Sequence, residues 1–152
     1  MHIHDLISPG RVTPSMPASS KKRLLEKLSA LLHEDEPELN AQAAFHALIE
    51  RERLGSTGIG EGVALPHGRL KGLKRAVGAF ATLENEMDYD SIDHKPVNMV
   101  FALLVPENAN EEHLRILSGL AGLFRNELFR QELLQAKSPK ELYSRLARLD
   151  TD

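Results

Sequence analysis

The sequence has no cysteine among its 152 residues. Disulfide bonds, thiol nucleophiles, and zinc or iron–sulfur sites built on cysteine are therefore excluded. Long apolar runs are also missing, because the longest, residues 99–105, is far too short to span a bilayer. The first residues, MHIHD, contain no basic region followed by an apolar stretch, so the sequence predicts no secretory signal. From these absences we expect a cytoplasmic protein.

A strong net charge is lacking as well. The formal net charge is −3 at pH 7, from 19 Lys and Arg residues against 22 Asp and Glu residues. This value argues against a nucleic-acid-binding protein that depends on a bulk basic surface, although it does not exclude a local basic patch. The 41% of hydrophobic and 27% of charged residues are typical of a globular protein. We expect a single domain over residues 1–152, without internal repeats.

Apolar spacing, glycine clusters and prolines divide the sequence into elements. Residues 1–18 are predicted to be irregular, apart from a short edge strand near residues 11–12. Two helices, a glycine-rich loop and three strands should follow, over residues 19–33, 37–53, 55–62, 63–65, 76–83 and 97–105. Two or three further helices should begin after Asn110, Asn126 and Ser138. The order predicts an α/β or α+β fold, in which helices cover a small mixed β-sheet.

The stretch RERLGSTGIGEGVALPHGR, residues 51–69, carries most of the chemical information. Gly55 and Gly60 have the spacing of a P-loop, but Glu61 and Gly62 stand where that motif needs lysine and a hydroxyl residue. A dinucleotide-binding fingerprint needs a strand before its glycines and a helix after them, and here the predicted order is the reverse. The sequence therefore argues against nucleotide binding.

Pro66 and Gly68 should hold His67 at the surface, where a strand ends. Neutral imidazole is a good nucleophile, and a phosphoryl group on it would need hydrogen-bond donors. An arginine, the hydroxyl groups of Ser56 and Thr57, and backbone N–H groups of the glycine-rich loop are donors of the right kind. Taken alone, a histidine in such a Pro-His-Gly turn is more often an ordinary exposed turn residue.

The same stretch resembles the signature of a known family. Arg51-Glu52 and the segments 55–60, 62–64 and 66–68 are similar to enzyme IIA of the mannitol/fructose type, a component of the bacterial phosphoenolpyruvate-dependent phosphotransferase system. Its nitrogen-regulatory branch is the most similar. The resemblance covers nearly the whole chain; it continues through residues 75–78, 92–93, 95–97, 101–106 and 113–118 and ends near residue 143. One departure is His94, where relatives usually have glycine in a turn.

The resemblance implies a mannitol-type IIA fold, with about five strands in a mixed sheet and helices on both faces. It implies that His67 is the phosphorylated nucleophile, with His113 and Arg51 as the other active-site residues. Ser56, Thr57, Gly58 and Gly60 are then the expected phosphate-binding residues. The phosphate would come from a small phosphohistidine carrier of the HPr or NPr type, and neither a metal nor another cofactor is expected.

Other roles remain open for these residues. Arg51 could also interact with the free carbonyl groups at the C-terminal end of its own helix, or it could be a solvated surface charge. His113 follows Asn110 by three residues; a helix N-terminus disfavours a charged imidazole, so a neutral His113 could donate to the phosphoryl group, or it could simply fill a polar groove. Glutamates at positions 61, 107, 111 and 112 are expected to form an acidic rim that steers a basic partner.

Three functions fit this sequence. The first is a phosphocarrier of the nitrogen-regulatory type, whose phosphate is a signal to downstream proteins. The second is a IIA subunit that passes phosphate to the IIB component of a sugar permease. The third is a binding module that has kept the fold without the chemistry.

Overall fold

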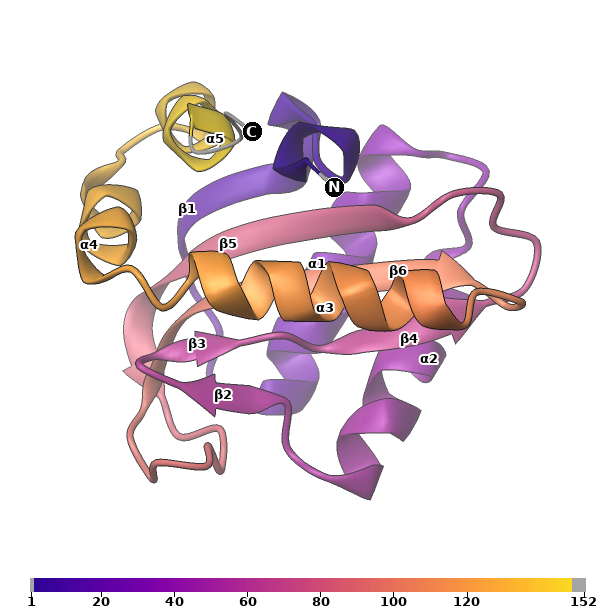
Figure 1. The fold of residues 1–152 in the computed structure, drawn as a ribbon, viewed down its shortest axis with the longest axis horizontal. Helices are drawn as coiled ribbons and strands as arrows, with labels where there is room; N and C mark the ends of the chain where they lie inside the picture. Colours follow the sequence, from indigo (N-terminus) through magenta and orange to yellow (C-terminus); the bar gives the residue numbers. More distant parts are fainter. Residues whose placement is uncertain (1, 149–152) are drawn as a thin grey trace.

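The computed structural model describes residues 2–148, in which a six-stranded mixed sheet has helices on both faces (Figure 1). β5 (Val77–Met87) and β6 (Val97–Pro106) form its antiparallel centre, and β1 (Val12–Met16) runs parallel to β5 at one edge. The predicted fold class is confirmed, with six strands in place of about five. β5 is longer than predicted, because the polar residues 84–86 extend it as an exposed end.

The opposite edge of the sheet corrects two sequence predictions. β6 pairs in parallel first with β3 (Val63–Ala64) and then with β4 (His67–Leu70). Pro66 does not end the strand region, because its carbonyl accepts a hydrogen bond from Leu103 (2.9 Å) and only its missing N–H interrupts the ladder. Part of the expected glycine-rich loop is likewise a strand, β2 (Gly58–Gly60), which pairs antiparallel with β3.

Helices cover the two faces unequally. α1 (Lys21–Asp35) and α2 (Ala41–Leu54) lie behind the sheet in Figure 1, whereas α3 (Glu111–Leu123) crosses in front of it. α4 (Glu127–Gln135) and α5 (Pro139–Arg148) pack with α3 into the core on the front side. Among the described residues, none of the helices is long and apolar enough to cross a membrane.

Several predicted helix starts are confirmed by their caps. The Ser20 hydroxyl accepts a hydrogen bond from the Arg23 N–H (3.1 Å), the Asn126 side chain accepts from Phe129 (3.0 Å), and the Ser138 hydroxyl accepts from Glu141 (3.1 Å). The predicted start of the second helix near Pro37 is wrong. Asn40 caps α2 instead, through Ala43 N–H (2.9 Å), since a proline permits a helix start but satisfies none of its free N–H groups.

The N-terminal segment is more ordered than predicted. Ile3, Leu6 and Ile7 are at most 3% exposed and belong to the core in front of the sheet. Two 3₁₀ turns carry this segment into β1, and turns this short have no periodicity that a sequence pattern can reveal. The buried Arg11 guanidinium fixes the segment by donating to the Leu6 carbonyl (3.1 Å) and by pairing with Asp35 (2.5 Å).

Candidate active site

His67 begins β4 and is partly exposed. Its Nδ1 lies 2.8 Å from the carbonyl oxygen of Leu65. A carbonyl can only accept a hydrogen bond, so Nδ1 must carry the proton and donate it. In neutral imidazole the lone pair is then on Nε2. The backbone two residues earlier thus selects the ring nitrogen that is able to react.

His113 lies beside His67, although 46 positions separate them in the sequence. The two ring centroids are 5.3 Å apart, with the planes inclined at 70°. His113 is the third residue of α3 and only 9% exposed, and its Nδ1 has no hydrogen-bond partner among the described residues. Asn110 precedes α3 as predicted, but its side chain makes no capping bond and instead accepts from Arg69 (3.4 Å).

Both imidazoles are held in the neutral form. Burial lowers the pKa of His67, and the Arg51 charge lowers it further, against the opposing Leu65 hydrogen bond and the Glu52 charge. Burial also lowers the pKa of His113, followed by the charges of His67, Arg69 and Arg51. Each ring therefore keeps a lone pair near neutral pH.

Arg51 occupies the last turn of α2, and its Nη1 donates to the Gly55 carbonyl (2.9 Å). The helix-terminal role left open by the sequence is thus observed, while the charge of Arg51 still acts on both imidazoles. Sequence reasoning did not single out Arg69, two residues after His67 on β4. Its Nη1 donates to the Glu107 carbonyl (3.0 Å), which holds its charge near His113. The signal for Arg69 was its position, because alternate residues of a strand share a face.

Comparison with known proteins identifies the family of this chain. The family described as phosphoenolpyruvate-dependent sugar phosphotransferase system, EIIA 2, matches residues 5–148. The chain belongs to this family. A nitrogen regulatory protein of Pseudomonas aeruginosa is 40% identical over 143 residues, 94% of this chain and 93% of the relative.

Solved structures show the same relationship. The nitrogen regulatory protein IIA-Ntr from Neisseria meningitidis is 43% identical, with a TM-score of 0.87 over 95% of this chain and 98% of that one. Enzyme IIA of the Escherichia coli mannitol system, solved in complex with phosphorylated enzyme IIB, has a TM-score of 0.75 at 17% identity. That alignment covers 93% of this chain and 99% of the other, and it shows the fold alone.

The predicted phosphate-binding residues of this EIIA chain make internal bonds. The Ser56 hydroxyl donates to the Tyr89 carbonyl (2.6 Å) and accepts from Gly58 N–H (3.1 Å). Thr57 is buried and directs both its N–H and its hydroxyl at Glu52. Gly60, at the other end of β2, lies against Asp93. Phosphate binding by these residues stays a prediction, and it would require some of these bonds to be exchanged.

The four glutamates do not form one rim. Glu61 lies in the β2–β3 turn and pairs with Arg130 (3.5 Å), whereas the glutamates at 107, 111 and 112 lie around the start of α3. Val63 pairs with Met99 and His67 with Leu103. At about 3.3 Å per strand residue, this register puts Glu61 well over 13 Å from His67 along β6. The guanidinium groups of Arg51 and Arg69 are the positive charges that act on the histidines.

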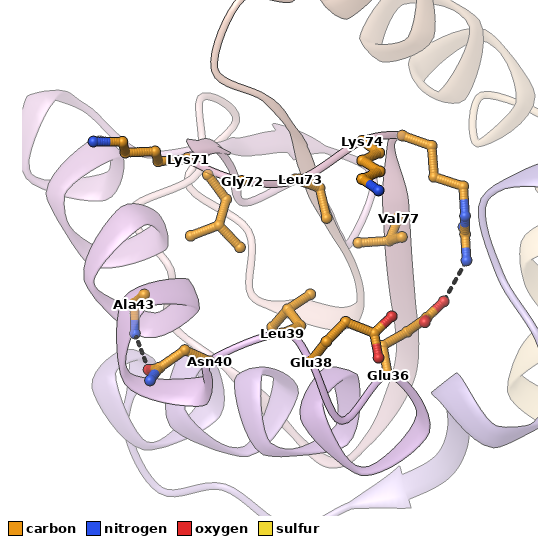
Figure 2. A pocket seen from close by; sticks show the side chains of 12 residues that line it. Glu36, Glu38, Leu39, Asn40, Ala43, Lys71, Gly72, Leu73, Lys74 and Val77 are labelled. Atoms are coloured by element: carbon orange, nitrogen blue, oxygen red, sulfur yellow. Dashed lines mark hydrogen bonds and ion pairs between the residues drawn. The ribbon is translucent and has the colours of Figure 1, made fainter.

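A cavity of about 540 Å³ lies at the other end of α2 and β4 (Figure 2). Leu39, Leu73 and Val77 point into its centre, and the Glu36–Arg75 ion pair lies at one side. His67, His113 and Arg51 do not line it. The candidate site residues of this EIIA chain therefore lie away from this cavity.

Proposed function

We propose that this EIIA protein is a phosphoryl carrier that accepts phosphate on Nε2 of His67 from a phosphohistidine carrier of the HPr or NPr type. The observation that carries the proposal is the Leu65 carbonyl bond, which leaves Nε2 with its lone pair on a partly exposed ring. Regulation in a nitrogen-related signalling branch is the proposed role, supported by the 40% identity to a nitrogen regulatory protein. A phosphoryl group adds charge, which changes which proteins can dock.

The transfer step balances without a further reactant. The Nε2 lone pair of His67 attacks phosphorus in line with the N–P bond of the donor, and that bonding pair returns to the donor imidazole. The donor ring leaves as neutral imidazole, because its other nitrogen already carries a proton. His67 becomes a phosphoimidazolium whose Nδ1–H still donates to Leu65, and the carbonyl dipole stabilises its new positive charge. One N–P bond replaces another, so the transfer is reversible.

His113 and the two arginines would stabilise the charge of the phosphoryl group. An orphaned buried N–H is rarer in proteins than an orphaned acceptor, so the buried Nδ1 of His113 favours the tautomer with its proton on Nε2. That N–H would donate to a phosphoryl oxygen. Arg51 and Arg69 supply positive charge, and Arg51 reaches the oxygens by releasing the Gly55 carbonyl.

Exposed apolar side chains support a protein as the phosphate donor. Leu114, 66% exposed, follows His113, and Leu54, 85% exposed, lies one helical turn after Arg51. Ile92, 79% exposed, is tied to the β2 edge through its N–H and the Gly58 carbonyl (3.3 Å). Exposed aliphatic side chains on the elements that carry a partly exposed ring suit docking of a macromolecule better than capture of a small substrate.

The test incubates the protein with phosphoenolpyruvate, enzyme I and a phosphocarrier, and localises the phosphate by mass spectrometry. We expect one acid-labile group on His67. His67→Ala should abolish it, whereas His46→Ala, which removes an exposed histidine on α2, should not. Equal labelling of His67→Ala would contradict the site, and absence of label from the wild type would favour a binding module without the chemistry.

The second candidate is a IIA subunit of a sugar permease. A fructose-specific EIIA component of Haloferax volcanii is 34% identical over 131 residues, 86% of this chain and 85% of the relative, and this likeness favours the second candidate. Adding a IIB component of the fructose or mannitol class to the phosphorylated protein separates the two roles. The regulatory proposal expects the phosphate to stay on His67, and rapid transfer to IIB would overturn it.

A further inference from the structure

Glu52 is a buried carboxylate that the transfer step does not use. It follows Arg51 in α2 but is only 7% exposed. One carboxylate oxygen accepts the Thr57 N–H (2.8 Å), and the other accepts the Thr57 hydroxyl (2.7 Å). Burying a charge is costly unless it is paired and hydrogen-bonded. The two hydrogen bonds from Thr57 therefore indicate that the buried Glu52 carboxylate has a structural role.

Two residues from other elements complete the surroundings of Glu52. The Lys21 ammonium, at the start of α1, lies 3.3 Å from the carboxylate and 4.2 Å from the Tyr89 ring centroid. Tyr89 is fully buried, and its hydroxyl lies 3.4 Å from the Thr57 hydroxyl. Glu52 and Tyr89 therefore contact Thr57 directly, and Lys21 holds Glu52 and Tyr89 in place by contacting both.

A continuous line of hydrogen bonds leads from Glu52 to the reactive ring. Thr57, held by Glu52, uses its carbonyl to accept the N–H of Leu65 (2.9 Å). Leu65 uses its own carbonyl to accept the Nδ1–H of His67 (2.8 Å). Leu65 belongs to neither β3 nor β4, so the Thr57 carbonyl is what fixes its backbone at this point.

We infer that Glu52 is a positioning residue, which fixes the Leu65 carbonyl through Thr57 and so holds His67 in the tautomer with a free Nε2. This inference rests on the proposed function for its kinetic consequence, but the tautomer of His67 is observable by itself. Glu52 acts on His67 through Thr57 and Leu65, and its own hydrogen bonds go to Thr57 and Lys21. A hydrogen bond to an ionised acceptor is roughly twice as strong as one between neutral groups, which explains the use of a carboxylate.

The charge of Glu52 acts in the same direction as its hydrogen bonds. It raises the pKa of His67 against the larger effect of burial. A negative charge near the ring favours the phosphoimidazolium that transfer creates. Loss of the charge should therefore lower the pKa of His67 as well as loosen the ring.

The test compares Glu52→Gln with Glu50→Gln in the full-length protein. Glutamine keeps the size and one acceptor of Glu52, while Glu50 is an exposed carboxylate on the same helix that pairs with Arg53. We expect Glu52→Gln to show a mixture of His67 tautomers in ¹⁵N NMR, a lower His67 pKa, and phosphoryl acceptance slower by about tenfold, as for other residues that orient a reactive ligand. Glu50→Gln should match the wild type in all three measurements.

Two outcomes would overturn the inference: an unchanged tautomer and pKa in Glu52→Gln, or a slower transfer without a change in either. If the wild type is not phosphorylated at all, the proposed function fails, and the NMR measurements still decide the positioning role. Thr57→Val and Thr57→Ser extend the test if Glu52→Gln does not fold. Valine removes the hydroxyl bond and should mix the tautomers, serine should restore a single one, and equal spectra for both would contradict the inference.

Discussion

The two ends of α2 and β4 differ in which charged groups they hold and in how these groups are paired. At the end with His67, one carboxylate is buried behind the ring, the two imidazoles are neutral, and two guanidinium groups lie nearby. At the cavity end, Glu36 pairs with Arg75, and the centre is lined by aliphatic side chains. The cavity is the more concave region, but the candidate chemistry lies at the other end. Concavity is a guide to small substrates, whereas a group exchanged between proteins has to be reachable from outside.

Substituting one arginine at each end should give the largest contrast. Arg51→Ala removes a charge that acts on both imidazoles, and we expect phosphoryl acceptance to slow by about 100-fold, or about 2.7 kcal/mol of transition-state stabilisation. Arg75→Ala at the cavity end should stay close to the wild-type rate. Single-turnover transfer from the phosphorylated carrier measures both. Similar losses in the two variants would remove the functional distinction between the two ends.

The pH dependence of the free energy of unfolding and of phosphoryl acceptance should also arise at the end that holds His67 and His113. Because the folded-state pKa values of His67 and His113 lie below 6.5, the unfolded chain binds more protons as pH falls through that value. The free energy of unfolding should therefore decrease from pH 6.5 downward, and the decrease should be smaller in His113→Ala. Phosphoryl acceptance should persist at pH 6.5, where ordinary imidazole is half protonated. Urea unfolding and transfer rates measured across this range check both expectations, and a half-maximal rate already at pH 6.5 would contradict the second.

Two asparagines at helix starts offer a comparison of stability. Asn40 caps α2 at the cavity end through Ala43, whereas Asn110 precedes α3 near His113 without a capping bond. We expect Asn40→Ala to lower the free energy of unfolding by about 1 kcal/mol and Asn110→Ala by less than about half of that. Denaturant titration measures the difference, and equal losses would show that the missing cap at α3 is formed in solution.

The smallest effect is expected at His94. Its φ of 61° lies in the left-handed region, which favours glycine. His94→Gly relieves steric strain but makes the unfolded chain more flexible, so a net stabilisation of about 0.5 kcal/mol is expected. Thermal unfolding detects it, and a lower melting temperature would show that the histidine side chain contributes contacts of its own.

Local signals in the sequence were sufficient for much of the fold. The caps at Ser20, Asn126 and Ser138 and the long apolar strand of β6 were predicted near their observed positions. The errors lie where tertiary contacts override local preference. β4 forms directly after a proline because it pairs in parallel with β6. Ile3 is buried because it packs against the core in front of the sheet.

The sequence predicted which residues belong to the candidate site but not how they are arranged. The sequence determined His67 as the candidate nucleophile through the resemblance of residues 51–69 to the family signature, since a Pro-His-Gly turn taken alone is more often an ordinary exposed turn. Only the tertiary structure decided that Nε2 is the free nitrogen, that His113 stands 5.3 Å away, and that Glu52 anchors Thr57. For His113 the physical reason is distance along the chain, because the docking of α3 brings it to β4. The other two contacts join residues close in sequence, but the backbone geometry that forms them depends on the pairing of β2, β3 and β4 within the sheet.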